Sequence, residues 1–145
     1  MAVKPLPSQE VLRQLLDYDP VSGALVWRHR HESSEFPLGS RWDSDRWNAK
    51  YAGKHALQST SPKGYLRGEL LGSCVRAHRV IWKLMTGSEP LVIDHINGVR
   101  TDNRFSNLRS VSNGENLKNS KIGKRNSSGH IGVSCLKRKT GEVWL

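Results

Sequence analysis

The sequence predicts an α+β fold made of small antiparallel strands and short helices. Two segments carry apolar residues at helical spacing, at 11–16 and 77–85. Between them lie short runs of strand character, such as 24–27 and 64–71, which glycines and prolines separate. Only 36% of the 145 residues are hydrophobic. That fraction is near the low edge for a globular domain and predicts a small core with much surface structure.

The first predicted helix begins after Ser8, which is a suitable N-cap residue. Pro20 lies shortly beyond its end. The helix would place four apolar residues on one face: Val11, Leu12, Leu15 and Leu16. Residues 17–23 then predict turns, and 24–27 predict a short strand.

A polar stretch over 29–48 predicts a long surface loop that Trp42 and Trp47 partly anchor. After it, short antiparallel strands are expected in three segments: 51–57, 64–71 and the stretch near 74–78. Two cysteines fall in predicted strands, Cys74 and Cys135, and we expect both to be small buried residues. Because the chain has no CxxC pair, neither a structural zinc site nor a disulfide framework is expected.

The best helical signal lies at 76–87, where Gly87 is a fitting residue for the C-terminal end. Its apolar residues have helical spacing: Ala77, Val80, Ile81, Leu84 and Met85. A strand is expected over 90–95, a turn at Asn97-Gly98 and a second strand over 108–111.

Residues 112–115 have the S-x-x-E form of a capping box, which predicts a helix from Asn113 through Asn119. A basic linker follows over 118–128. The last residues, 130–145, predict two strands around a Thr-Gly turn.

The formal charge is +10, from 23 Lys and Arg against 13 Asp and Glu, and the isoelectric point is about 10.1. Such a surplus attracts polyanions, of which nucleic acid is the commonest. An anionic membrane surface is the rival partner. However, the sequence has no long basic amphipathic helix and no apolar run that could span a bilayer or act as a secretory signal. We therefore expect a soluble, intracellular protein that is not secreted and has no membrane partner.

The segment 93–116 is rich in Asp, His and Asn. Asp94 and His95 end the first predicted strand, Asn107 precedes the second, and Asn116 lies one turn into the helix. Because consecutive strand residues point to opposite faces, Asp94 and His95 share a site only if the strand ends or bends there. The duller alternative is that these residues are turn formers and caps.

A carboxylate and an amide oxygen suit Mg²⁺ or Mn²⁺ better than zinc. A histidine has an ordinary pKa of about 6.5, so at neutral pH it can take a proton from a water molecule. With a phosphodiester between His95 and a metal ion, these groups would form a one-metal hydrolysis site.

The same residues resemble the HNH endonuclease motif, in the branch found in phage and intron homing endonucleases. The matching residues are His78-Arg79 with Trp82, Asp94-His95 with Gly98 and Asn103, Asn107-Leu108-Arg109, and Glu115-Asn116. The resemblance covers roughly residues 76–120 and implies a ββα-metal (His-Me finger) nuclease core.

The resemblance implies His95 as the general base, and Asp94 and Asn116 as ligands of one Mg²⁺ or Mn²⁺ ion. Asn107 would orient His95 or tie down the loop. Asn116 stands where many members of the broader family have the last His, which lowers the expected affinity for zinc or nickel. The implied substrate is double-stranded DNA, without a small-molecule cofactor, and we favour a monomer. One copy holds one site, so the product would be a nick.

The flanking regions match less tightly. The pattern around 16–27, together with Ala52-Gly53-Lys54 and Gly64-Tyr65-Leu66, is similar to the N-terminal portion of the same phage proteins. The tail around 128–144 is similar to the start of an AP2-like DNA-binding domain, cut off after two strands. We therefore expect an N-terminal DNA-binding or scaffold region at 1–75, the nuclease core at 76–120, and a basic linker with a truncated hairpin at 121–145.

Several basic residues are expected to contact DNA phosphates beside this core. They are Arg79, Arg109, Lys118, Lys121, Lys124 and Arg125. His78 is expected to pack or to touch a phosphate. If phage-encoded, the protein would act in the cytoplasm of the bacterial host. The alternative is a non-catalytic, sequence-specific DNA-binding protein with a degenerate HNH fold.

Overall fold

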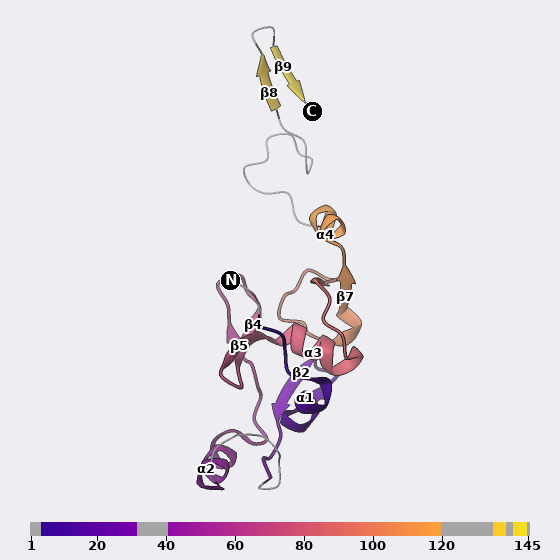
Figure 1. The fold of residues 1–145 in the computed structure, drawn as a ribbon. Helices are drawn as coiled ribbons and strands as arrows, with labels where there is room; N and C mark the ends of the chain where they lie inside the picture. The colour runs from indigo at the N-terminus through magenta and orange to yellow at the C-terminus, as the bar shows by residue number, and fades with distance from the viewer. Residues whose placement is uncertain (1–3, 32–40, 120–134, 139–140, 145) are drawn as a thin grey trace. The chain divides into compact units, whose positions relative to one another are not determined.

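The structure is a computed structural model that describes residues 4–31, 41–119, 135–138 and 141–144. For 41–43 and for residues after 116 it describes the backbone only. The chain divides into two compact units, residues 1–110 and 111–145, and each is described by itself. Helices alternate with small antiparallel strands, as expected for an α+β fold (Figure 1). Among the described residues, no helix is long and apolar enough to cross a membrane.

The first helix and strand pair confirm part of the N-terminal prediction. Helix α1 (Gln9–Leu15) begins after Ser8, whose hydroxyl accepts a hydrogen bond from Val11 N at 3.3 Å. Strands β1 (Leu16–Asp19) and β2 (Ala24–Trp27) then pair antiparallel. The predicted turn over 17–23 is therefore too long.

The turn between β1 and β2 is confined to four residues because Asp19 organises it. The Asp19 carboxylate accepts bonds from Val21 N at 3.0 Å and from Ser22 Oγ at 2.6 Å. The Asp19 carbonyl accepts from Gly23 N at 2.8 Å. This compact turn leaves residues 17–19 free to pair with β2.

Helix α2 (Arg41–Tyr51) lies where the sequence predicted a loop, so that prediction is wrong for 41–48. Trp47 stacks edge-on against Trp27, with ring centroids 5.4 Å apart, and the Arg30 guanidinium lies 3.6 Å from the centre of its ring. The anchoring role expected of Trp47 is confirmed; the side chain of Trp42 lies outside the described part. These contacts, which apolar periodicity does not reveal, attach the polar helix to β2.

The strand predicted over 51–57 is also wrong. Tyr51 ends α2, and the backbone after it makes only an isolated bridge between His55 and Val26. Gly53 N donates to Trp27 O at 2.8 Å, which continues the attachment to β2 without forming a strand.

A three-stranded sheet and a helix follow. Strands β3 (Ser59–Thr60), β4 (Leu66–Leu70) and β5 (Ser73–Arg76) are antiparallel neighbours in that order. Helix α3 (Ala77–Thr86) begins directly after β5 and ends at Gly87, whose φ of 77° is a left-handed conformation that glycine adopts freely. The strongest helical prediction is thus confirmed.

Helix α3 packs against α1 and against β4 and β5, so it lies at the centre of the first unit (Figure 1). Val80 and Ile81 are fully buried in this core, whereas Met85, predicted on the same face, is 44% exposed. Cys74 is exposed, contrary to prediction, because burial along β5 alternates and Cys74 shares the outer face with Arg76. The side chain of Cys135 is outside the described part.

Strands β6 (Val92–His95) and β7 (Leu108–Val111) form a two-stranded sheet, joined by a loop that ends in the short 3₁₀ turn η1 (Phe105–Asn107). The predicted strands are confirmed. The predicted turn is found too, since Gly98 N donates to His95 O at 2.9 Å.

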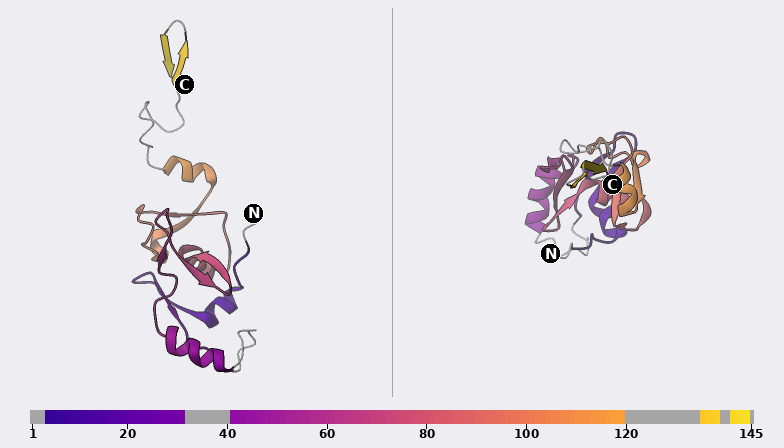
Figure 2. Two further views of the ribbon diagram at one scale, coloured as in Figure 1. Left: turned by 90° about the vertical axis from the view of Figure 1, so that its left-hand side faces the viewer. Right: turned by 90° about the horizontal axis from the view of Figure 1, so that it is seen from above.

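In the second unit, helix α4 (Asn113–Asn119) has the predicted bounds. Its capping box is formed in both directions: Ser112 N donates to Glu115 Oε2 at 2.8 Å, and Glu115 N donates to Ser112 Oγ at 3.2 Å. Strands β8 (Cys135–Arg138) and β9 (Gly141–Trp144) form the predicted antiparallel hairpin (Figure 1; Figure 2, left). The order strand, strand, helix is present along the chain, and its assembly into a ββα-metal core stays a prediction.

Candidate active site

The end of β6 carries the two residues on which the predicted chemistry depends. Burial alternates along the strand: Ile93 and His95 are buried, and Asp94 between them is partly exposed. The alternation persists through His95, so the two side chains leave opposite faces of β6. The chain turns directly afterwards, at Gly98.

His95 is held by an amide on the following loop. Its Nε2 lies 3.0 Å from Asn103 Oδ1, and the two residues are only 4% and 2% exposed. An amide oxygen only accepts, so this bond requires the ring proton on Nε2 and leaves Nδ1 as the basic nitrogen. Among the described residues Nδ1 has no hydrogen-bond partner, yet it is not one of the buried unpaired atoms, so solvent still reaches it.

A second histidine and a tyrosine lie against the His95 ring. The ring centroid of His78, on α3, is 5.3 Å from that of His95, and Tyr65 lies 5.2 Å from His78 and 5.9 Å from His95. Burial, aided by the positive charges of His95, Arg76 and Arg79, lowers the pKa of His78 to about 3. His78 is therefore neutral at physiological pH and packs against the site, one of the two roles expected of it.

The β1–β2 hairpin contacts the backbone of Asn103. Tyr18 Oη donates to Asn103 O at 2.9 Å and accepts from Phe105 N at 2.8 Å. Gly23 lies so close that a Cβ atom there would be 2.6 Å from Arg104 N and 2.7 Å from Asn103 C. Burial raises the pKa of the Tyr18 hydroxyl, which stays protonated and can make both bonds. The partner of His95 is thus fixed by a hairpin distant in sequence, with Tyr18 lying 85 positions before Asn103.

Asn107 ties down the loop between β6 and β7. Its Oδ1 accepts from Asn97 N at 3.0 Å, and its Nδ2 donates to Asn97 Oδ1 and to Asp102 O, both at 2.9 Å. The Asn107 carbonyl also accepts from Ile96 N at 2.8 Å. Of the two roles that the resemblance implies for Asn107, these bonds fit the second, because none of them reaches His95.

The same loop contains an ion pair. Arg104 donates to Asp102 through Nε at 2.8 Å and through Nη2 at 2.6 Å, and Asn97 Nδ2 donates to Asp102 at 2.7 Å. The bond from Arg104, more than any other group, holds the pKa of the Asp102 carboxyl well below its usual range. Asp102 therefore remains charged and contributes to fixing the loop.

Asp94 is paired across the sheet with Arg109 of β7. Arg109 Nη2 and Nε lie 2.7 Å and 3.1 Å from the same oxygen, Asp94 Oδ2. Within the described part of the chain, Asp94 Oδ1 has no partner. The carboxylate is thus oriented by one oxygen while the other is available, which fits the donor expected of a hard cation.

The DNA-contact residues predicted from charge are distributed unevenly. Arg109 is bonded to Asp94, and Arg79 donates to the carbonyls of Pro90 at 3.1 Å and Leu91 at 3.4 Å. Lys118 lies on α4, but its side chain is not described, and Lys121, Lys124 and Arg125 lie outside the described residues. Their contacts with DNA stay a prediction.

Asn116 lies on α4, in the second unit, so the proposed metal ligands are described in separate units. Among the described residues, no three His, Cys, Asp or Glu side chains gather as a metal-binding group. The predicted ligands are one carboxylate, Asp94, and one amide, Asn116, so they do not form a group of three such side chains. The pairing of Asp94 with Asn116 stays a prediction.

Sequence reasoning missed the residues that hold and flank His95: Tyr18, Tyr65 and, as its direct partner, Asn103. Asn103 falls within the resembling motif, but the loop holds several asparagines, and nothing in the sequence indicates which one faces the ring. Tyr18 and Tyr65 lie far away in sequence, and only tertiary structure brings them near.

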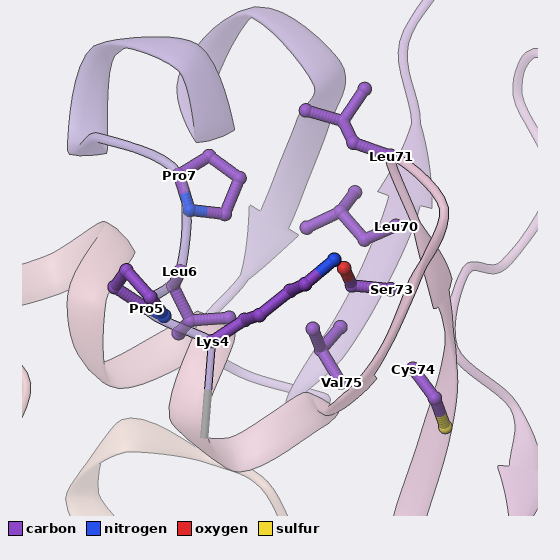
Figure 3. A pocket seen from close by; sticks show the side chains of 9 residues that line it. All are labelled: Lys4, Pro5, Leu6, Pro7, Leu70, Leu71, Ser73, Cys74 and Val75. Carbon is purple, nitrogen blue, oxygen red and sulfur yellow. The ribbon is translucent and has the colours of Figure 1, made fainter. Parts of the chain in front are cut away.

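A cavity of about 570 Å³ lies elsewhere in the first unit, between the N-terminal segment and the β4–β5 hairpin. Figure 3 shows the side chain of Lys4 extended between these two parts, with Pro7, Leu70 and Val75 among the mainly apolar lining. None of the residues around His95 lines this cavity, so it is separate from the candidate site.

His95 is an oriented histidine with an open ring nitrogen, and its neighbour in sequence, Asp94, is a carboxylate with a free oxygen. These are groups that a hydrolase can use to activate water at the end of β6. Residues 75–118, which include all four predicted catalytic and metal-binding positions, match the model of a family described as HNH endonuclease. The match, which covers less than half of the chain, suggests a nuclease domain. No curated protein and no solved structure matches the chain.

Proposed function

We propose that the protein is a metal-dependent HNH endonuclease that hydrolyses phosphodiester bonds in double-stranded DNA. The observation that carries the proposal is the bond from His95 Nε2 to Asn103 Oδ1, inside the segment that matches the HNH family. This bond fixes the tautomer and orientation of a histidine whose Nδ1 is open to solvent. A general base needs both properties.

His95 Nδ1 would take a proton from a water molecule as the oxygen of that water attacks the phosphorus atom. The bond between phosphorus and one sugar oxygen breaks, and that oxygen leaves with a proton from solvent. Asp94 and Asn116 would hold one Mg²⁺ or Mn²⁺ ion, with Arg109 orienting the Asp94 carboxylate. When bound, the ion supplies positive charge to the phosphate and the departing oxygen.

Because Asp94 and His95 leave opposite faces of β6, a phosphate that both serve must lie at the end of the strand, where the chain turns. One copy holds one site, so a monomer would nick one strand. The homing-like function, the phage origin and the action in a bacterial cytoplasm belong to the same proposal, as do the DNA contacts of the basic linker and of the AP2-like hairpin. They are supported by the sequence patterns alone.

Incubation of supercoiled plasmid with the protein tests the proposal. Open circles should form with Mg²⁺ or Mn²⁺ and not with EDTA. His95→Ala should lower the nicking rate on the order of 10²–10⁴-fold, the usual contribution of a general base, while duplex binding persists. His55→Ala, which removes an exposed histidine, is the matched control and should nick normally.

Full nicking by His95→Ala would show that another group is the base. A mobility shift without nicking under any metal condition would instead favour the alternative, a DNA-binding protein with a degenerate HNH fold. Asp94→Ala and Asn116→Ala test the proposed metal ligands. Unchanged nicking in Mg²⁺ by either variant would show that the substituted residue is not a ligand. Asn113→Ala, on the same helix as Asn116, is the control for Asn116→Ala.

A further inference from the structure

Two arginines converge on Tyr65, the aromatic neighbour of His95. The guanidinium carbons of Arg76 and Arg100 lie 5.2 Å and 5.0 Å from the centre of the Tyr65 ring, within the range of cation–π attraction. Arg76 comes from the end of β5 and Arg100 from the loop after β6. We call Tyr65, Arg76 and Arg100 the arginine–tyrosine cluster.

Tyr65 is held in place by its own loop. Ser61 N donates to Tyr65 O at 2.8 Å, and Tyr65 N donates to Ser61 Oγ at 3.0 Å. Arg100 is fixed further by a bond from its Nη1 to the carbonyl of Lys63. The cluster is thus an ordered arrangement of two cations around one ring, and that ring touches the ring of the proposed base.

The charges of the cluster are not compensated. Three other arginines of the first unit form ion pairs with carboxylates: Arg28 with Asp17, Arg104 with Asp102 and Arg109 with Asp94. Arg76 and Arg100 are exposed, and within the described part of the chain neither is paired with a carboxylate. Exposed, unpaired guanidiniums are free to bind an anion in a two-pronged geometry.

The surroundings of Arg76 add to the positive potential. Arg67 of β4 lies directly opposite Arg76 of β5, and like charges in that position repel. Glu69 is on the same face of the hairpin but forms no ion pair with either arginine among the described residues. Arg76 also precedes α3, whose first turn has no acidic residue and no capping side chain, so the positive end of the helix dipole is not offset there.

We propose that Arg76 and Arg100 bind phosphate groups of the DNA strand that His95 attacks, with Tyr65 holding the two guanidiniums in position. This rests on the proposed function and extends it by naming the contacts that position the substrate. Arg76 and Arg100 act as positioning residues: they bring the backbone to His95 and take no part in proton transfer. A bound phosphate would also relieve the repulsion between Arg67 and Arg76.

The test compares two double variants of the full chain. Arg76→Gln/Arg100→Gln removes both charges of the cluster. Arg13→Gln/Lys54→Gln removes two exposed charges that have no side-chain partner in the described part and are remote from the site in sequence. Binding to a labelled DNA duplex is measured in EDTA over a range of salt concentrations, and plasmid nicking is measured separately in Mg²⁺ or Mn²⁺.

We expect the cluster variant to bind DNA more weakly and with a flatter salt dependence. Each phosphate contact contributes a slope of about 0.9 in log Kd against log salt, so the loss of two should reduce the slope by about 1.8. The thermal midpoint should change little, because the relief of the repulsion between Arg67 and Arg76 offsets the loss of the weak contacts with Tyr65. Arg76→Lys/Arg100→Lys should restore the slope, since it restores the charges.

An unchanged salt slope in the cluster variant would overturn the proposal, and so would an equal loss in the control variant. A large fall in the thermal midpoint would also overturn it, because the arginines would then be structural. The outcome is independent of catalysis: if the wild type does not nick DNA in any metal, the proposed function fails, but the salt slopes still decide whether the cluster binds phosphates.

Discussion

The two sides of the His95 ring differ in how they are held. On one side, His95 is hydrogen-bonded to Asn103, and the Asn103 backbone accepts a hydrogen bond from Tyr18 and lies close to Gly23. On the other, it lies against Tyr65, toward which two arginines extend without carboxylate partners. The first side is closed by paired polar groups, and the second keeps unpaired charge at the surface.

The difference reflects two requirements of a hydrolytic site. A base must be held in one orientation, and paired hydrogen bonds between buried groups achieve this at little cost in stability. A surface that binds DNA must keep its cations free, and like charges held close together destabilise the empty protein. Substitutions on the closed side, around Asn103, should therefore alter stability and turnover. Substitutions on the open side, around Tyr65, should alter the affinity for DNA and its salt dependence.

The largest effect is expected from Gly23→Ala, on the closed side. A Cβ atom at Gly23 would lie 2.6–2.7 Å from the backbone of Asn103 and Arg104, and the φ of 77° is itself unfavourable for alanine. The φ alone costs about 1–2 kcal/mol, and displacement of Asn103 should also lower the nicking rate. Chemical denaturation and plasmid nicking measure the two effects.

Gly53→Ala is the control for this prediction, because Gly53 has a φ of 76° but nothing within 4 Å of a Cβ atom. Gly53→Ala should lose only the roughly 1–2 kcal/mol that the left-handed φ costs alanine, and it should nick DNA at the wild-type rate. Equal effects at the two glycines would show that the contact of Gly23 with the Asn103 segment has no role in the site.

A smaller effect is expected from Tyr18→Phe, which removes both hydrogen bonds to the Asn103–Phe105 backbone and leaves the ring in place. Leaving these backbone groups without a partner should cost about 1–3 kcal/mol of stability. At saturating DNA the turnover should fall while KM stays constant, because Tyr18 acts on the position of the base and not on substrate binding.

Tyr51→Phe is the control, since the Tyr51 hydroxyl has no hydrogen-bond partner in the described part of the chain. A rise in KM at constant turnover in Tyr18→Phe would contradict the assignment, because it would place Tyr18 on the DNA-binding side.

Local patterns were enough to predict the elements that carry the site. The apolar spacing of α3 and the capping box of α4 are encoded within a few residues, and so are strand β6, which holds Asp94, and strand β7, which directly follows Asn107. The missed helix α2 depends on contacts of Trp47 with Trp27 and Arg30, which are not local. Propensity and periodicity do not report such tertiary contacts.

The sequence also does not reveal which arginines are bonded to other groups of the protein and which lack a carboxylate partner. Charge alone does not distinguish Arg79 and Arg109, which were predicted as DNA contacts, from Arg76 and Arg100, which were not. The structure separates them by geometry, since Arg79 bonds backbone carbonyls and Arg109 bonds Asp94. Which cation is neutralised depends on the register of β6 against β7 and on the path of the loops, and neither can be read from composition.

The smallest effect is expected from changes at Tyr65, on the open side. Its hydroxyl has no hydrogen-bond partner among the described residues, so Tyr65→Phe should change stability by less than about 0.5 kcal/mol and leave DNA affinity intact. Tyr65→Leu removes the ring on which the two guanidiniums rest, and each exposed cation–π contact is worth about 0.5–1 kcal/mol.

Because Tyr65→Leu keeps both charges, its affinity for duplex DNA should fall modestly while the salt slope stays close to that of the wild type. Titration of the labelled duplex in EDTA checks both quantities, with Tyr65→Phe as the matched control. Removal of the same hydroxyl group should thus be costly at Tyr18 and nearly silent at Tyr65. A Tyr65→Phe variant as impaired as Tyr18→Phe would mean that both sides of His95 are held by hydrogen bonds, and the contrast between them would be lost.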